Sequence, residues 1–279
     1  MDYPSFDQFE YWFVYQNDKS WEIIDKKTNE RIGWINLSGT TLYAGQPEDM
    51  FGSFPNWDMY KLRPEFKVGQ PLDVTGNAES VKQSYEDLLR GVLMCRSYQS
   101  HKDPDKSTAY IEKILSWLKE TDFYDAPAST IFHESFPHGL MRHSILVYNN
   151  MLELIEISKF KDVVNIDSAA LCCLVHDWCK INLYQPFKKN VKNEQTGKWE
   201  QKDSYKRGRF EHPFGHGAAS MWMATKMFNL NEEEALALRW HMSMFNVASN
   251  EINEYQQACE EYPLVHLLQF SDQLSITSY

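Results

Sequence analysis

The sequence predicts a mostly α-helical protein with a small appended module, of β or irregular type, at its N-terminal end. From about Asn77 onward, apolar residues recur with helical periodicity in one segment after another. Residues 1–75 contain short aromatic and β-branched runs instead, followed by a stretch rich in Gly, Pro and Asp. Of the 279 residues, 43% are hydrophobic and 14% aromatic, which is enough for a sizeable core.

The N-terminal segment 1–75 is expected to form the separate module. The runs WEIID and RIGWINL read as two strands that are joined by the polar turn KKTNE. The Gly-, Pro- and Asp-rich stretch that follows is typical of loops and linkers. We therefore place a domain boundary near residue 75 and expect residues 76–279 to form one helical domain, with its principal motifs in residues 130–279.

Each expected helix has an apolar face of helical spacing or an identifiable start. In the first, the apolar positions Val81, Tyr85, Leu88 and Leu89 follow the 3.6-residue period. Ser107 is expected to cap the second helix, and Asn231 the sixth. The expected helices are 77–98, 107–120, 139–157, 166–181, 212–228, 231–245 and 261–275.

The polar stretch 184–212 is expected to be a long loop with a local excess of basic residues. Long loops in compact domains are often functional lids. A lid would bring basic side chains to a substrate, whereas an ordinary solvated surface loop is an equally good interpretation. The basic residues with candidate substrate contacts are Lys188, Lys189, Arg207 and Arg209.

Charge and cysteine usage narrow the class of protein. The net charge of −11 argues against a broad nucleic-acid surface, because phosphate binding requires a positive patch. The five cysteines are odd in number and form no CxxC pair, so buried reduced thiols are expected. The first residues resemble no secretory signal, and no apolar run reaches membrane-spanning length. A soluble cytoplasmic protein without membrane contact is expected.

Histidines and aspartates interrupt the apolar faces of the last five expected helices. Each alone is ordinary, since a lone helical histidine is more often a core or surface residue than a ligand. Together they can face one interior point if the helices form a bundle, and bundle interiors hold metal sites of this kind. A cation would also compensate a buried His-Asp pair next to the apolar run LCCLV. The candidate ligands are His143, His176, Asp177, His216, His241 and Asp272.

The sequence lacks the motifs that mark several other kinds of catalytic or nucleotide-binding site. No HExxH occurs, which argues against a zincin-type protease, and no GxSxG occurs, which argues against that type of serine hydrolase. Neither GxGxxG nor GxxxxGK[ST] is present, so the usual nucleotide-binding motifs are missing. Cys179 lies near His176 without a cysteine-protease signature around it.

The order His, His-Asp, His, His, Asp resembles that of the HD-domain metal-dependent phosphohydrolases. HGLMRHS resembles the GGLxxHS segment of this family, and VHDWCK resembles its HDxxK motif. FGHGAAS followed by RWHMSM resembles the GHGxxS…RWHM pattern of one bacterial and phage branch, and FSDQLS resembles the closing segment. The resemblance covers residues 130–279, and its departures, such as His138 in place of a glycine, remove none of the candidate ligands.

The resemblance implies an HD-domain helical bundle that hydrolyses a phosphate ester or anhydride at one or two divalent ions of Mn, Fe, Co, Ni, Zn or Mg. Such ions polarise phosphoryl oxygens and activate water. The implied substrate is a phosphorylated small molecule such as a nucleotide, a nucleotide second messenger or a short nucleic acid, with long nucleic acid less favoured. A non-catalytic nucleotide sensor or partner-binding module with a structural metal is the alternative.

Residue roles follow from the same resemblance. Asp177 and Lys180 are the implied catalytic residues. The first metal is implied to bind His143, His176, Asp177 and Asp272, and the second Asp177, His216 and His241. Lys180, Arg142 and Arg239 are phosphate-binding candidates, against the alternatives of a solvent-facing lysine and of surface salt bridges. His212 is expected at a helix cap or lid edge, with metal binding as the lesser alternative.

Overall fold

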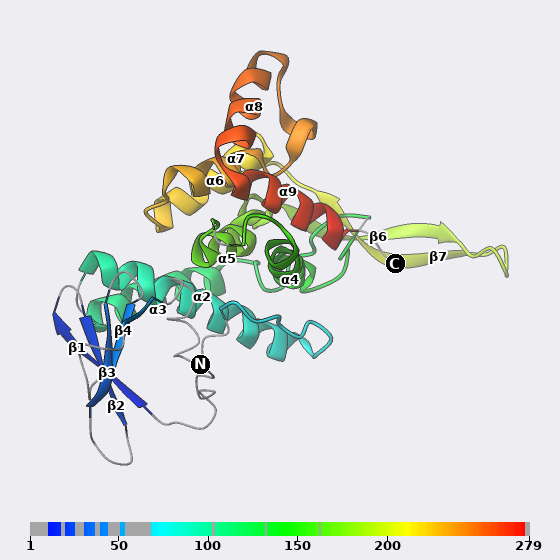
Figure 1. The fold of residues 1–279 in the computed structure, drawn as a ribbon. Helices are drawn as coiled ribbons and strands as arrows, with labels where there is room; N and C mark the ends of the chain where they lie inside the picture. The colour runs from blue at the N-terminus through cyan, green and yellow to red at the C-terminus, as the bar shows by residue number, and fades with distance from the viewer. Residues whose placement is uncertain are drawn as a thin grey trace.

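The structure is a computed structural model in which residues 68–101, 104–131, 133–161 and 163–276 are described. In the preceding part of the chain it describes the strand segments 11–17, 20–25, 31–36, 40–43 and 51–53. The prediction of a mostly α-helical protein is confirmed (Figure 1). The helices are α2 (Ala78–His101), α3 (Pro104–Glu120), α4 (Gly139–Ile157), α5 (Ile166–Val175), α6 (His216–Met227), α7 (Glu232–Trp240), α8 (Ile252–Glu261) and α9 (Pro263–Ser275), with short 3-10 turns η2 (Trp178–Lys180), η3 (Ser243–Asn246) and η4 (Ser249–Glu251).

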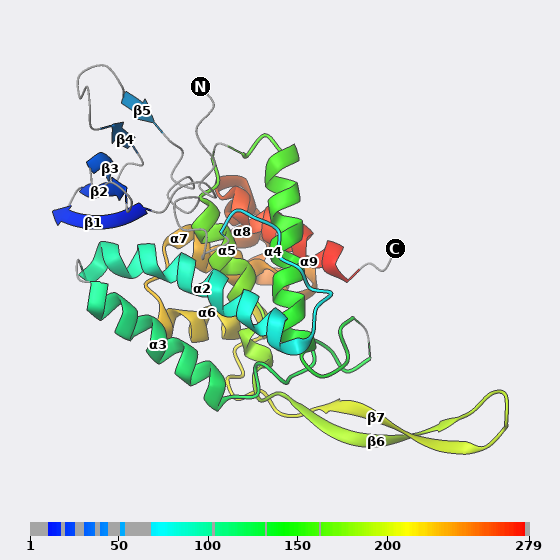
Figure 2. The same cartoon turned by 90° about the horizontal axis from the view of Figure 1, so that it is seen from below.

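Helix α5 lies in the middle of the helical body, where it packs against α2, α4, α7 and α9 (Figures 1 and 2). Its nine residues other than Asp167 are all buried, which explains why the apolar run LCCLV lacks a polar face. The Asn165 side chain caps the helix by accepting hydrogen bonds from the amides of Asp167 and Ser168. Because α5 is enclosed, the residues that directly follow Val175, His176 and Asp177, lie in the interior of the protein.

Two expected helices end earlier than their sequence patterns predict, and both end at candidate ligands. Helix α5 stops at Val175, so His176 and Asp177 form a turn before η2 instead of continuing a helix to residue 181. Helix α7 stops at Trp240, so His241 follows the helix, and the predicted extension to residue 245 is wrong. The side chains of the candidate ligands His176, Asp177 and His241 thus lie directly after the ends of these two helices and point inward.

The structure confirms one of the predicted helix starts and differs from others. Asn231 caps α7 in a capping box with Glu234, as predicted. Ser107, predicted as a cap, lies within α3, which begins at Pro104. Helix α6 begins at His216, so His212 lies outside it. Helix α8 occupies a stretch for which no element was predicted.

The N-terminal strands form one antiparallel sheet in the order β1 (Tyr11–Asn17), β2 (Ser20–Asp25), β3 (Arg31–Asn36), β4 (Thr40–Tyr43) and β5 (Phe51–Ser53). The two predicted strands are β2 and β3, which pair antiparallel, and the turn KKTNE predicted between them lies outside the described residues. The predicted boundary near residue 75 stays a prediction, because residues 54–67 all lie outside the described residues.

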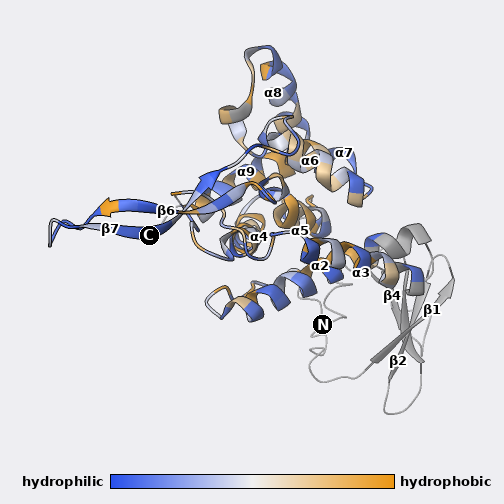
Figure 3. Ribbon diagram, turned by 180° about the vertical axis from the view of Figure 1, so that it is seen from behind, coloured by the Kyte–Doolittle hydropathy of each residue, from blue (hydrophilic) through white to orange (hydrophobic). Residues whose placement is uncertain are grey.

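The stretch 184–212 is a two-stranded hairpin and not the long loop that was predicted. Strands β6 (Tyr184–Lys192) and β7 (Trp199–Arg207) pair in register over their whole length, with Tyr184 opposite Arg207 at the base. The hairpin extends away from the helices (Figures 1 and 2), and its residues are mostly hydrophilic (Figure 3). Its middle and tip therefore cannot cover the interior of the helical body as a closed lid would.

Two expectations about the chain as a whole can be compared with the structure. Cys172, Cys173, Cys179 and Cys259 are free thiols, and the first three are buried, as predicted. Among the described residues, no helix combines the length and the apolar character needed to cross a membrane.

Candidate metal centre

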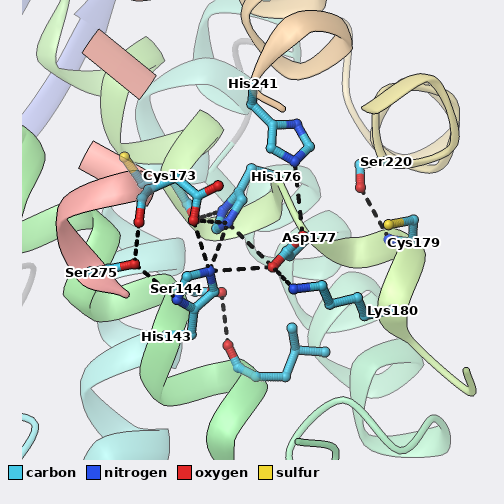
Figure 4. A network of polar contacts seen from close by, with 12 residues as sticks. His143, Ser144, Cys173, His176, Asp177, Cys179, Lys180, Ser220, His241 and Ser275 are labelled. Atoms are coloured by element: carbon cyan, nitrogen blue, oxygen red, sulfur yellow. Dashed lines mark hydrogen bonds and ion pairs between the residues drawn. The ribbon is translucent and has the colours of Figure 1, made fainter. Parts of the chain in front are cut away.

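Imidazole and carboxylate side chains carried by five helices, or by the turns that follow them, meet beside the C-terminal end of α5. Figure 4 shows His143, His176, Asp177 and His241 of this cluster. Four of these residues, His143, His176, Asp177 and His241, are at most 3% exposed. The side chains of His216 and Asp272 are each 18% exposed, so the cluster reaches solvent on their side. The sequence-predicted ligands are thus brought together: His143 from α4, His176 and Asp177 after α5, His216 at the start of α6, His241 after α7 and Asp272 from α9.

Two glycines in the motifs allow the backbone to approach closely around the cluster. A Cβ atom on Gly217 would lie 2.2 Å from the carbonyl oxygen of Arg239, so only glycine lets the start of α6 contact the end of α7. This contact brings the rings of His216 and His241 to 5.2 Å between centroids. A Cβ atom on Gly139, the first residue of α4, would likewise lie 2.0 Å from the carbonyl oxygen of Glu134 in the preceding loop.

One half of the cluster is formed by His143, His176 and Asp272. His143 Nε2 lies 3.2 Å from His176 Nε2 and 3.2 Å from Asp272 Oδ1. The same nitrogen lies 3.3 Å from Asp177 Oδ2, which connects this half to the other. One ligand atom from each of the three residues falls within 4.8 Å of the others, a spacing that suits a single bound cation.

Hydrogen bonds at the Nδ1 atoms turn the Nε2 atoms of three histidines toward the cluster. His176 Nδ1 donates to the Cys173 carbonyl at 2.8 Å, and His241 Nδ1 donates to the Leu238 carbonyl at 2.8 Å. The Ser275 hydroxyl donates to the Asp272 carbonyl at 2.6 Å, so its oxygen is available to accept from His143 Nδ1 at 3.2 Å. With Nδ1 protonated, each Nε2 carries a lone pair, which is the tautomer that binds metals.

The other half of the cluster surrounds Asp177 Oδ1. His216 Nε2 lies 2.6 Å from this oxygen, and His241 Nε2 lies 3.9 Å from it. Asp177, His216 and Cys179 also offer three ligand atoms within 4.8 Å of one another. Asp177 therefore contacts both halves of the cluster, one through each carboxylate oxygen.

Lys180 is a buried partner of the central carboxylate. Its Nζ lies 2.6 Å from Asp177 Oδ2, and its side chain is 10% exposed. The alternative of a solvent-facing lysine is therefore excluded. Burial alone would lower the pKa of Lys180, but the Asp177 carboxylate outweighs burial and raises it, so the ammonium stays charged.

In the first half of the cluster, pairing between opposite charges affects the pKa values more than burial does. Burial alone would lower the pKa of His143, but hydrogen bonds with Asp177 and Asp272 raise it. Burial alone would raise the pKa of Asp177, whereas Lys180 and His176 hold it well below its usual range. The pKa of Asp272 is lowered in the same manner, against burial, mainly by its hydrogen bond with His143. The carboxylates therefore remain ionised and require positive charge beside them.

In the second half of the cluster, the pKa values of the two histidines are shifted in opposite directions. Burial opposes protonation of His216, yet the neighbouring Cys179 and Asp177 raise its pKa to about 10. Burial and then the proximity of His216 and His176 lower the pKa of His241 to about 3. At neutral pH in the metal-free protein, His216 carries a proton that a cation would replace, and His241 is neutral.

The residues present fit a divalent metal. His241 Nε2 is buried and, within the part of the chain that the structure describes, has no hydrogen-bond partner. His143 Nε2 and His176 Nε2 lie 3.2 Å apart, so a cation bound between them would replace the proton that links them. A buried acceptor without a donor costs about 1–3 kcal/mol, and a metal ion removes this penalty. Imidazole and carboxylate donors together suit borderline and hard divalent ions.

Most of the predicted phosphate-binding residues lie outside the cluster. Arg142 donates to both carboxylate oxygens of Glu134 at 2.7 Å, and Arg239 pairs with Glu251 at 2.8 Å. The salt-bridge alternative therefore describes both arginines. On the hairpin, Lys188 pairs with Asp203 at 2.8 Å.

The remaining basic candidates differ in their distance from the hairpin base. Lys189 lies in the middle of β6, and Arg209 follows the end of β7. Arg207 lies opposite Tyr184 at the base, where burial raises the pKa of Tyr184 and the charges of Lys180 and Arg207 oppose the increase. Arg207 is thus the hairpin cation that shares its surroundings with Lys180.

Three residues near the cluster were missed or given little weight by sequence reasoning. Cys179 lies within the Asp177 half, although no motif marked it. Ser275 orients His143, and its spacing of three residues after Asp272 was the available signal. The ring of His133 lies 4.8 Å from that of His143, whereas the ring of His212 packs against Trp222 and belongs to neither group of candidate ligands.

Comparison of the chain with protein-family models, with curated proteins and with solved structures gave no match.

Proposed function

We propose that this protein is a metal-dependent phosphohydrolase that cleaves a phosphoester or phosphoanhydride bond. The observation that carries the proposal is the convergence of four histidines and two aspartates in one cluster. In it, His143 Nε2 and His216 Nε2 contact carboxylates, and the buried His241 Nε2 has no partner among the described residues. The order of these residues along the chain, which resembles that of HD-domain phosphohydrolases, supports the same reaction class.

The chain's own residues have distinct roles in this proposal. His143, His176 and Asp272 would hold the first cation, His216 and His241 would hold the second, and Asp177 would contribute to both. When bound, divalent ions polarise a phosphoryl group and activate water. Each histidine is held in position through its Nδ1 atom or, for His216, by the start of α6.

Lys180 has two tasks in the proposed reaction. It compensates the charge of Asp177 and fixes one carboxylate oxygen at 2.6 Å. An ammonium has three N–H donors, and the Asp177 contact uses one of them, which leaves donors for a phosphate oxygen. Arg207 and Tyr184, which lie opposite each other at the hairpin base, supply a second cation and an aromatic ring, and the charges of both Lys180 and Arg207 act on Tyr184.

The proposed substrate is a nucleotide, a nucleotide second messenger or a short nucleic acid. The net charge of −11 disfavours long polyanions, which require an extended positive surface. The partly exposed His216 and Asp272 provide the side from which a small phosphorylated molecule reaches the cluster.

One observation favours a second candidate function. Four of the six candidate ligands are at most 3% exposed, and closed metal sites are typically structural. In that case the protein is a nucleotide sensor or partner-binding module in which the metal stabilises the fold.

A hydrolysis assay separates the two functions. The parent protein, loaded with Mn²⁺, is incubated with a panel of nucleotides and dinucleotides, and the products are separated by ion-exchange chromatography. The catalytic proposal predicts turnover that falls at least about 100-fold in Asp272→Asn, because lost metal ligation removes several kcal/mol of transition-state stabilisation. Asp203→Asn on the exposed hairpin is the control and should retain full activity. Nucleotide binding by the loaded parent without turnover of any substrate would support the sensor instead.

A further inference from the structure

The half of the cluster around Asp177 Oδ1 contains a sulfur atom. Cys179 Sγ, an Asp177 oxygen and a His216 ring nitrogen lie within 4.8 Å of one another. Cys179 is 5% exposed, and its backbone amide donates to Ser220 Oγ at 3.1 Å. Ser220 lies one helical turn after His216 on α6, so this hydrogen bond ties the thiol to the helix that supplies the imidazole.

His241 provides a separate reason to expect a cation at this position. Its Nε2 atom is buried, has no hydrogen-bond partner among the described residues and lies 3.9 Å from Asp177 Oδ1. Its Nδ1 atom is occupied by the Leu238 carbonyl, so the free atom is a lone pair directed at the carboxylate. Two acceptors that face each other across a buried gap need a positive group between them.

We infer that Cys179 Sγ is a metal ligand and that, with Asp177, His216 and His241, it makes the second cation position selective for Zn²⁺, Fe²⁺ or Co²⁺. Sulfur is a soft donor that favours these ions, whereas Mg²⁺ and Mn²⁺ favour oxygen ligands. One sulfur, two nitrogens and one oxygen also match the number and the kinds of ligand atoms that zinc binds. On binding, the thiol releases its proton to solvent and coordinates as a thiolate.

The inference deepens the proposed function by defining which class of metal binds at one of its two positions. It rests on the proposed function only for the role of that metal in catalysis. If the position holds a thiolate-ligated ion, its affinity should follow the softness of the metal. The other position, with His143, His176 and Asp272, has no sulfur donor among its predicted ligands and should discriminate less.

Cobalt spectroscopy tests for the sulfur directly. The full-length protein is stripped of metal, reconstituted with Co²⁺ alone and measured by ultraviolet–visible absorption. The parent should show a thiolate-to-Co²⁺ charge-transfer band in the near ultraviolet, and Cys179→Ser should lose the band. Cys259→Ser is the matched control, because Cys259 lies on α8 among Tyr255 and Gln269, outside the cluster, and this variant should keep the band.

A competition titration adds a second readout that does not depend on activity. Cys179→Ser should weaken Zn²⁺ binding by at least about tenfold while changing Mn²⁺ binding much less. Cys179→Ala is measured in parallel, with circular dichroism to establish that the variants are folded; if both fail to fold, the presence of the band in the parent and in Cys259→Ser decides.

The possible results separate this inference from the proposed function. Bound Co²⁺ without a charge-transfer band in the parent would overturn the sulfur ligand and leave the phosphohydrolase proposal standing. A thiolate band in a protein that hydrolyses no phosphate compound would support the ligand and count against the proposed function. Failure to bind Co²⁺ and Zn²⁺ would overturn the sulfur ligand, and failure to bind Mn²⁺ as well would overturn both.

Discussion

Replacement of Asp177 by Asn tests whether this carboxylate is the electrostatic centre of the cluster. Asp177 Oδ2 lies 2.6 Å from Lys180 Nζ, and Asp177 Oδ1 lies 2.6 Å from His216 Nε2. The Asp177 side chain is 3% exposed and that of Lys180 is 10% exposed. Asn keeps the shape of the side chain and removes its charge, which leaves a buried ammonium in the metal-free protein without its counter-ion.

The magnitude follows from the burial of the pair. Removal of one partner from a buried ion pair costs about 3–5 kcal/mol, because the remaining charge stays desolvated. The matched control is Asp203→Asn, which breaks the 2.8 Å pair with Lys188 where the side chains are 87% and 62% exposed. Exposed pairs contribute about 0–1 kcal/mol. A difference of roughly 3 kcal/mol between the two variants corresponds to roughly 6–12 °C in Tm.

The assay is urea unfolding of the chelator-treated proteins near neutral pH, followed by circular dichroism. Asp177→Asn should lower the free energy of unfolding by the amount given above, and Asp177→Asn/Lys180→Met should recover part of it, because the unpaired ammonium is gone. If Asp177→Asn costs no more than Asp203→Asn, the pair is effectively solvated and the reasoning about the buried cluster is refuted.

Three further predictions concern backbone packing, substrate contact and pH. Gly217→Ala would place a Cβ atom 2.2 Å from the carbonyl oxygen of Arg239, so it should displace α6 from the end of α7 and weaken metal binding measured by calorimetry; unchanged affinity would contradict the role given to this glycine. Arg207→Ala should raise the KM of the proposed hydrolysis about tenfold, the effect of one charge-assisted hydrogen bond, whereas Lys189→Ala in the middle of the hairpin should leave it unchanged; equal effects would argue against substrate binding at the hairpin base. The pKa of His216 is raised from 6.5 to about 10 in the metal-free protein, so its protonated form contributes stability that is fully present below pH 6.5 and is lost as the pH rises toward 10. The free energy of unfolding of the chelated protein should therefore fall across this range, and His216→Gln should fall less steeply; parallel curves would show that His216 does not carry the effect.

The sequence predicted the helices well where one face is buried. Helices α2 and α4 carry apolar residues at helical spacing, and the candidate ligands interrupt such faces, which is why the cluster could be anticipated. Helix α8 was missed because only Tyr255 and Ala258 are buried in it, too few to form a pattern.

The hairpin and the helix ends could not be predicted for physical reasons. Strands β6 and β7 are exposed on both faces, so they lack the alternation of apolar and polar residues that marks a half-buried strand. The ends of α5 and α7 at Val175 and Trp240 are fixed by tertiary contacts, among them the packing of Gly217 against Arg239.

The role of Cys179 depends on geometry that the sequence does not show. The thiol lies in η2, after the interruption of the helix that follows Val175. If α5 had continued to residue 181, as the sequence pattern predicted, the side chains of Asp177 and Cys179 would have the relative positions of residues two apart in a regular helix. The turn instead places Cys179 with Asp177 and with His216 from another helix.

The central claim is that the histidine and aspartate cluster binds a divalent metal, and metal content tests it most directly. The protein is purified without a metal-affinity step or chelator and measured by inductively coupled plasma mass spectrometry, beside His176→Ala/Asp177→Ala. We predict about one or two equivalents of Mn, Fe, Co, Ni or Zn in the parent and their loss in the variant. A parent protein that contains no metal, and that takes up neither Mn²⁺ nor Zn²⁺ on reconstitution, would contradict the claim.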